Sequence, residues 1–310
     1  MSNVKIYGIV FGILIGIIVV GAIVFSNMFD DSKELSPTDT NTIIPSDNLT
    51  VKEIIDSNLT QQVVLFETSN ASPFDFYLTP RDNYRITETN SDNLIDQVRL
   101  ELKPKFLELF ESISSADDTL VIYPTFTSAA YSEPGFYTFF RGECDESCIT
   151  DLSFANPTLG FTSSGTSTQI LYLLGYEFLT DVDVDKNPDI LKNYNTVILL
   201  HNEYVTQRIF DAVTSHPNII YLFPNALYAE IDVNYDDDTM TLIRGHNYPE
   251  FEIKNGFDYE IEQRFHDYEY DTDCYNWQFI EFENGYALNC YPDSMLHTNL
   301  DILLKLKELS

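Results

Sequence analysis

The residue types best suited to chemistry lie directly behind two strongly apolar runs. The run TVILL leads into His201 and Glu203, and the run NIIYLF leads, after one proline, into Asn225. A carboxylate can ligate a metal or act as a general base, and an imidazole beside it can move protons. Since side chains alternate along an extended chain, His201 and Glu203 are expected on the same side. The opposing interpretation is a buried, hydrogen-bonded loop without a chemical role.

The two apolar runs are predicted to be neighbouring strands of a parallel sheet. Near-continuous apolar runs are typical of strands buried on both faces, and a helical pattern separates these two. The other elements of this alternation are the strands Thr119–Tyr123 and Tyr176–Leu179 and the helices Ser167–Leu174, Pro188–Lys192 and Thr206–Thr214. Ligands bind at the carboxyl ends of such strands, so we expect His201, Glu203 and Asn225 to line one crevice.

Other elements are predicted before and after this alternation. They are the strand Gln62–Phe66, a helix over Leu94–Ile113 that Pro104 interrupts, a β-hairpin over 229–244 and a closing helix at Asn299–Leu309. We therefore expect an α/β domain over residues 61–228. Residues 229–310 are expected to form a small β-rich appendage with the hairpin, a cysteine-containing segment and the terminal helix.

Four cysteines lie in two local pairs, Cys144 with Cys148 and Cys274 with Cys290. An even number in a chain that faces an oxidising compartment favours two local disulfides. A structural zinc site is the alternative, but the spacings lack the paired C-x2-C knuckles of such sites. Neither pair follows a predicted strand-to-helix turn, so a cysteine nucleophile is not expected.

The charge balance excludes one class of partner. The chain holds 17 Lys and Arg against 49 Asp and Glu, a formal net charge of -32. Such a surface repels phosphate backbones, so nucleic acid is not expected as a partner. Cations and basic partners are compatible with this charge, and the same acidity also favours solubility.

The N-terminal region predicts a single-pass protein of the cell membrane. Ile6–Phe25 holds twenty uncharged, mostly apolar residues, which at about 1.5 Å per residue span a hydrocarbon core of about 30 Å. A cleaved signal peptide is the alternative, but its apolar region is shorter and ends at a small-residue cleavage site. Lys5 before the run and Asp30 after it place residues 1–5 in the cytoplasm and the C-terminal domain outside. Residues 26–60, rich in Ser, Thr, Asp and Pro, are expected to form a flexible tether.

The stretch Gly175–Ile231 carries a series of motifs that resembles a known family. The order is Gly-Tyr, Thr-Asp with further acids, Leu-x-x-Tyr, a His-x-Glu-Tyr after a strand, and a strand that ends at Asn. In this order it is similar to the C-terminal domain of the large subunit of N,N-dimethylformamidase, and Ala130-Tyr131 resembles that family's Ala-Tyr segment. The resemblance implies a class I glutamine amidotransferase-like, flavodoxin-like fold.

The resemblance also implies an amide-hydrolysing site with one iron ion held by a carboxylate and tyrosinates. Matched residue by residue, Glu203 is the carboxylate ligand and Tyr131 one phenolate ligand. His201 and Asn225 line the pocket beside them, so His201, Glu203 and Asn225 are the expected catalytic residues. Tyrosinate and carboxylate oxygens are hard donors that suit iron. The candidates for the second tyrosine are Tyr77 and Tyr84.

Two hypotheses follow from these observations. The first is a membrane-anchored extracytoplasmic protein that hydrolyses C–N bonds of small amides with the help of iron. The second is a non-catalytic envelope protein that uses the same fold to bind a cation, a glycan or a protein partner. Bound iron that depends on Glu203 distinguishes the first hypothesis from the second.

Overall fold

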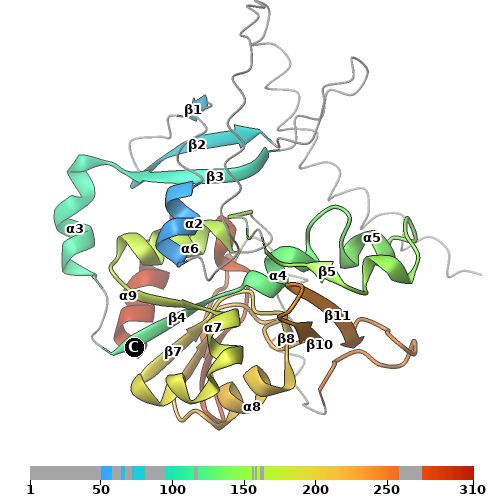
Figure 1. Ribbon diagram of the computed structural model, residues 1–310. Coiled ribbons are helices and arrows are strands. Elements are labelled where there is room, and N and C mark those ends of the chain that lie inside the picture. Colours follow the sequence, from blue (N-terminus) through green and yellow to red (C-terminus); the bar gives the residue numbers. More distant parts are fainter. Residues whose placement is uncertain are drawn as a thin grey trace, which may run out of the picture. The chain divides into compact units, whose positions relative to one another are not determined.

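A computed structural model of the chain describes residues 50–57, 64–66, 72–80, 95–114, 118–155, 157, 159–160, 164–257 and 274–310 (Figure 1). The chain divides into two compact units, residues 1–45 with 80–95 and residues 46–79 with 96–310. The candidate site lies in the second unit. The predicted membrane anchor Ile6–Phe25 and residues 26–49 of the predicted tether lie outside the described residues. The prediction of a flexible tether over residues 26–60 is wrong for Val51–Ser57, which form a helix whose Val51 and Ile54 side chains are buried. Among the described residues, no helix has the length and apolar character needed to cross a membrane.

A six-stranded sheet carries the strands that precede the chemistry-bearing residues. Its order is β12-β13-β9-β7-β4-β6, and neighbours are parallel except β12 and β13, which are antiparallel. The bounds are β4 Thr119–Tyr123, β6 Glu177–Thr180, β7 Thr196–Leu199, β9 Ile219–Tyr221, β12 Phe279–Phe282 and β13 Gly285–Leu288. The prediction of an α/β fold with a parallel sheet is confirmed.

Alternation along the inner strands divides the hydrophobic core between the two faces of this sheet. Leu120 and Ile122 of β4 belong to one buried cluster, and Val121 between them belongs to another. The first cluster includes residues of the helices α4 Thr125–Ala130, α7 Asp181–Lys186 and α8 Gln207–Ser215. The second includes residues of α3 Leu107–Ser112, α6 Gly165–Leu173 and α9 Leu300–Leu309. Burial of each such aliphatic side chain contributes about 1.5–3 kcal/mol, so helices on both faces stabilise the sheet.

Two smaller sheets complete the strands of the described part. One has the order β5-β11-β10-β8, with β5 Leu152–Ser153, β8 Tyr204–Val205, β10 Ala229–Asn234 and β11 Thr239–Arg244. Its β10–β11 pair is the predicted hairpin, and β8 begins directly after Glu203. The other sheet has the order β1-β2-β3, with β1 Val64–Phe66, β2 Phe74–Pro80 and β3 Ile95–Leu102. The short helices outside these layers are α2 Val51–Ser57 and α5 Phe136–Phe140.

Two further sequence-based expectations differ from the structure. The helix predicted over Leu94–Ile113 is wrong for its first half, which forms β3, while a 3-10 turn and α3 follow at Pro104. The C-terminal segment 229–310 is not wholly an appendage, because β13 pairs in parallel with β9 and extends the six-stranded sheet. Both differences arise where pairing with a distant strand decides the local conformation.

Both predicted disulfides are present. Cys144 is bonded to Cys148 and Cys274 to Cys290, and the described cysteines include no free thiol. The second bridge is buried, with Cys274 1 % and Cys290 0 % exposed, and it joins the two ends of the β12–β13 hairpin. This bridge therefore fixes the segment that follows β13.

Candidate functional site

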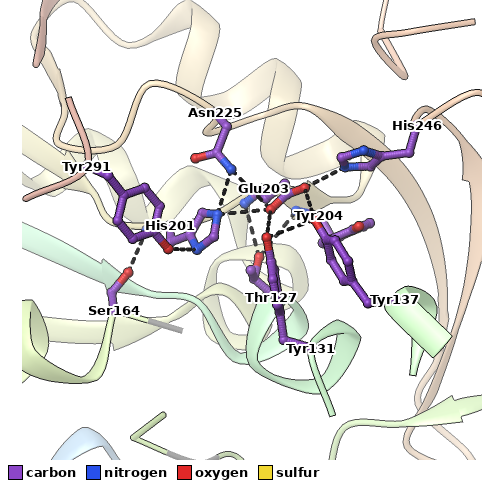
Figure 2. A network of polar contacts seen from close by, with 10 residues as sticks. All are labelled: Thr127, Tyr131, Tyr137, Ser164, His201, Glu203, Tyr204, Asn225, His246 and Tyr291. Atoms are coloured by element: carbon purple, nitrogen blue, oxygen red, sulfur yellow. Dashed lines mark hydrogen bonds and ion pairs between the residues drawn. The ribbon is translucent and has the colours of Figure 1, made fainter. Parts of the chain in front are cut away.

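Glu203 lies at the centre of a network of buried polar side chains (Figure 2). It stands between β7 and β8, beyond the carboxyl end of an inner strand of the six-stranded sheet, and is 1 % exposed. Five side chains approach its two carboxylate oxygens, namely Tyr131, Tyr137, His201, Asn225 and His246. A carboxylate offers about four lone-pair positions, so these five groups compete for fewer acceptor positions than they need.

Two phenols contact Glu203. Tyr131 donates to Oε2 at 2.9 Å and Tyr137 donates to Oε1 at 3.2 Å, and the two hydroxyl oxygens lie 2.8 Å apart. Tyr131 follows the last residue of α4, and Tyr137 lies in α5. The short connection between these two helices therefore places both rings near Glu203. A side chain at Gly135 would meet the carbonyl oxygen of Ser132 at 2.3 Å, so this tight connection requires glycine there.

An amide and two imidazoles complete the network. Asn225 Nδ2 donates to Glu203 Oε2 at 3.1 Å and lies 2.6 Å from His201 Nε2. His201 Nε2 lies 2.9 Å from Glu203 Oε2, and His246 Nε2 lies 2.5 Å from Oε1. The residues that follow β7 and β9 therefore share one site, as expected for the ends of neighbouring parallel strands.

Helix α4 holds the backbone of Glu203 in place. Thr127 Oγ1 accepts hydrogen bonds from the backbone N–H groups of Glu203 at 3.0 Å and Tyr204 at 3.2 Å. Asp181 accepts from the backbone N–H groups of Thr125 and Phe126 at the start of α4, at 3.0 and 3.2 Å. Burial raises the pKa of Asp181 well above its ordinary value, although those two N–H groups act in the opposite direction. The position of Glu203 thus depends on a helix that is itself held at its first turn.

His246 reaches Glu203 from a turn of uncommon backbone conformation after β11. Gly245, His246 and Asn247 have positive φ angles of 124°, 53° and 67°. The turn is held by hydrogen bonds from His246 N to the Lys254 carbonyl at 3.0 Å and from Asn247 N to the Ile253 carbonyl at 2.7 Å. A left-handed conformation at a residue other than glycine costs about 1 kcal/mol or more. Surrounding contacts therefore impose the conformation that presents this imidazole.

The electrostatics of the network favour a charged carboxylate and neutral phenols. Burial opposes ionisation of Glu203, but hydrogen bonds and charges of His201 and His246 outweigh it and hold the pKa of that carboxyl well below its usual range. Burial, and then the charge of Glu203, raise the pKa of Tyr131 and Tyr137 well above the ordinary tyrosine value. A bound cation would lower the pKa of a phenol, because it favours the deprotonated form.

All four site residues named from the sequence lie together: Tyr131, His201, Glu203 and Asn225 (Figure 2). Sequence reasoning missed the other members of the network, which are Thr127, Tyr137, Ser164, His246 and Tyr291. Tyr137 is the second phenol, six residues after Tyr131, and this short spacing within one aromatic segment is the signal that was available. Of the two earlier candidates, Tyr77 lies in β2 of the three-stranded sheet and Tyr84 lies outside the described residues.

The donor atoms of the site are mainly oxygens. Tyr131, Tyr137 and Glu203 bring two phenol oxygens and a carboxylate into mutual hydrogen-bond distance. Within the described ranges, no group of three or more His, Cys, Asp or Glu side chains has the arrangement of a metal site. Compared with known proteins, the chain matched no model of a protein family and no curated protein.

Proposed function

We propose that this chain is an iron-dependent hydrolase of small amides, built on a class I glutamine amidotransferase-like, flavodoxin-like domain. The observation that carries the proposal is the meeting of Tyr131, Tyr137 and Glu203 at the carboxyl ends of parallel strands. The resemblance to the dimethylformamidase C-terminal domain supports it, because that resemblance names Tyr131, Glu203, His201 and Asn225 independently of their spatial proximity.

The residues fit an iron ion in two respects. Phenolate and carboxylate oxygens are hard ligands, and three such groups lie within hydrogen-bond distance of one another. The five groups around Glu203 also exceed its acceptor positions, so replacing the two phenol protons by a cation relieves the excess of donors. Tyr131, Tyr137 and Glu203 would hold the ion. When bound, it would supply a Lewis acid that polarises an amide carbonyl and acidifies a water molecule.

His201 and Asn225 are the residues placed to orient an amide beside this cluster. The Asn225 Oδ1 atom is buried and has no hydrogen-bond partner among the described residues, although Nδ2 is engaged. An unpaired buried acceptor costs about 1–3 kcal/mol, and the N–H of a substrate amide is a suitable donor for it. His201 Nε2 lies 2.6 Å from the same side chain and can hold a proton next to the leaving nitrogen.

The location we propose follows from the N-terminal sequence. Ile6–Phe25 would anchor the chain in the cell membrane, with residues 1–5 in the cytoplasm and the domain outside. The two disulfides support an oxidising compartment. The substrates would then be small extracytoplasmic amides, and the membrane would be the partner of the anchor. Residues 26–49, between the proposed anchor and the described part of the chain, would reach about 25–30 Å as a flexible coil.

The test uses the full-length protein purified in detergent. We expect bound iron by elemental analysis, a visible absorption band from tyrosinate to iron, and release of amine from a panel of small N-substituted amides. Tyr137→Phe should weaken the band and the hydrolysis together. Tyr235→Phe is the matched control, because the Tyr235 hydroxyl also contacts a buried carboxylate, Asp185, at 2.5 Å, and Asp185 lies outside the Glu203 network.

Two results would contradict the proposal. Protein that takes up no iron in air and releases no amine would favour the alternative, a non-catalytic envelope protein that binds a cation, a glycan or a protein partner through this fold. If Tyr137→Phe left the iron content unchanged, the iron would have to bind away from the phenol cluster.

A further inference from the structure

The two side chains that reach the Oε1 atom of Glu203 come from two segments that one disulfide connects. Tyr137 in α5 donates to Oε1 at 3.2 Å, and His246, in the turn after β11, has its Nε2 atom 2.5 Å from the same oxygen (Figure 2). The bridge between Cys144 and Cys148 lies between these two segments. Each of its cysteines is tied to one of them.

Cys144 is tied to α5. The backbone N–H groups of residues 141–143 fold back on this helix and donate to the carbonyl groups of three of its residues at 2.8 to 3.1 Å. One of those carbonyl groups belongs to Tyr137. Cys144 directly follows these residues. The position of Cys144 is therefore coupled to that of the helix that carries Tyr137.

Cys148 is tied to β11. The next residue, Ile149, is 1 % exposed, and its carbonyl oxygen accepts a hydrogen bond from the backbone N–H of Leu242 in β11 at 2.9 Å. The strand β5, which follows on the chain, pairs in antiparallel orientation with β11. The turn that presents His246 begins where β11 ends. The position of Cys148 is therefore coupled to that of His246.

The disulfide supplies the fixed link between these two couplings. Apart from the bridge, Cys144 and Cys148 are joined through residues 145–147, which are exposed and form part of one 3-10 turn. A disulfide limits its two Cα atoms to a separation of about 4.4–6.8 Å, and here they lie 6.2 Å apart. Without the bridge, the end of α5 and the segment beside β11 would be free to separate.

The side chains that reach the other oxygen, Oε2, have different supports. Tyr131 directly follows α4, whose first turn is held by Asp181. His201 and Asn225 follow β7 and β9, which are inner strands of the six-stranded sheet. Loss of the bridge should therefore loosen the Oε1 side of Glu203 and leave the elements of the Oε2 side in place.

We propose that Cys144 and Cys148 are positioning residues, whose disulfide holds Tyr137 and His246 at the separation at which both reach Oε1 of Glu203. The bridge acts on one side of the carboxylate only. Its importance for iron rests on the proposed function, but the coupling of α5 to the His246 turn does not.

The test is hydrogen–deuterium exchange of the backbone, followed by mass spectrometry, in the full-length protein in detergent after a chelator has removed any metal. The double variant Cys144→Ala with Cys148→Ala removes the bridge. Exchange should accelerate about tenfold or more over residues 136–143 and 242–247, and by less than about twofold over residues 125–131 and 201–205. Glu146→Ala, an exposed position in the same loop, keeps the bridge and is the matched control.

Reduction of the wild type gives the same information without a substitution, even if the double variant does not fold. Dithiothreitol should open the bridge of the partly exposed Cys144 first, because Cys274 and Cys290 are only 1 % and 0 % exposed. Alkylation of the freed thiols and peptide masses identify the opened bridge. The reduced protein should show the exchange pattern expected of the double variant, and re-oxidation should restore the wild-type pattern.

The inference is wrong if loss of the bridge leaves exchange over residues 136–143 and 242–247 unchanged. It is equally wrong if all four segments accelerate alike, because the bridge would then be a general stabiliser. Neither result depends on iron or on amide hydrolysis. If the protein takes up iron as proposed, the double variant should weaken the tyrosinate-to-iron band as Tyr137→Phe does, and a band of wild-type intensity would overturn the positioning of Tyr137.

Discussion

Glu203 and Asp293 are equally buried carboxylates, each 1 % exposed, yet their pKa values are shifted in opposite directions. Imidazoles, phenols and an amide surround Glu203, and the imidazoles hold its pKa well below the ordinary value despite burial. Asp293 accepts from Ser167, and burial raises its pKa to about 6. None of the groups that act on Asp293 carries a positive charge. Burial alone therefore does not decide the charge of a carboxylate, and the partners do.

Glu203 has the surroundings of a candidate functional site, whereas Asp293 has those of a structural helix cap. Asp293 fixes one turn of α6 with neutral donors, which is a local task. Glu203 gathers ionisable side chains from segments far apart in the sequence, namely Tyr131, Tyr137, His201 and His246. Clustered ionisable groups with displaced pKa values are typical of functional sites. We therefore expect changes at Glu203 to act mainly on ligand binding, and changes at Asp293 to act on stability.

The largest effect is expected for Glu203→Gln. The amide cannot supply the negative charge that an iron ion needs, so the affinity for iron should fall by more than about 100-fold, beyond the usual cost of an outer-shell partner. Iron per chain, measured by elemental analysis, tests this. Glu230→Gln, a partly buried carboxylate on β10, is the control and should retain iron. If Glu203→Gln bound as much iron as the wild type, Glu203 would not be an iron ligand.

Asp293 should make the protein less stable as the pH rises. The folded state keeps the Asp293 proton until about pH 6, whereas an unfolded chain loses it near the ordinary value of 3.8. Because the folded state binds more protons between these values, the free energy of unfolding falls as the pH rises through them. The pKa difference corresponds to about 3 kcal/mol. That loss is complete above the folded-state pKa.

Asp293→Asn removes this titration. The free energy of unfolding of the wild type, relative to this variant, should decrease by about 3 kcal/mol from about pH 3 to about pH 7. Urea unfolding followed by near-ultraviolet circular dichroism measures the difference. Asp236→Asn, at an exposed position in the turn between β10 and β11, serves as the control. A constant difference between wild type and Asp293→Asn would mean that Asp293 ionises normally in the folded state.

The strand ends that carry Glu203 could be predicted because buried parallel strands leave continuous apolar runs in the sequence. This holds for β4, β7 and β9, whose residues are all buried. The prediction failed for β3, where Val98, Leu100 and Leu102 fit a period of two as well as a helical face. Only pairing in the three-stranded sheet resolves that ambiguity.

More than half of the residues in the Glu203 network could not be predicted from the sequence, for a similar reason. His201 and Asn225 follow strands of one sheet, so strand order alone brings them together. His246 lies in the turn after β11. Tyr291 lies in the segment after β13, which is placed by the pairing of β13 with β9 and by the disulfide of Cys290. No periodic pattern in the sequence indicates that either side chain reaches the site. The signals that were available are weak: Gly245 and Asn247 beside His246, and Cys290 beside Tyr291.

The smallest effect, and the sharpest test of how the fold holds the site, is expected for Thr127→Val. Valine has nearly the shape of threonine but cannot accept the N–H groups of Glu203 and Tyr204, which are buried. Leaving these donors unpaired should lower the free energy of unfolding by about 2 kcal/mol. Thr127→Ser keeps the hydroxyl and loses a methyl group, so it should cost about 0.8 kcal/mol. If serine is the more damaging substitution, packing rather than hydrogen bonding by Thr127 positions Glu203, and the link from α4 to the carboxylate is wrong.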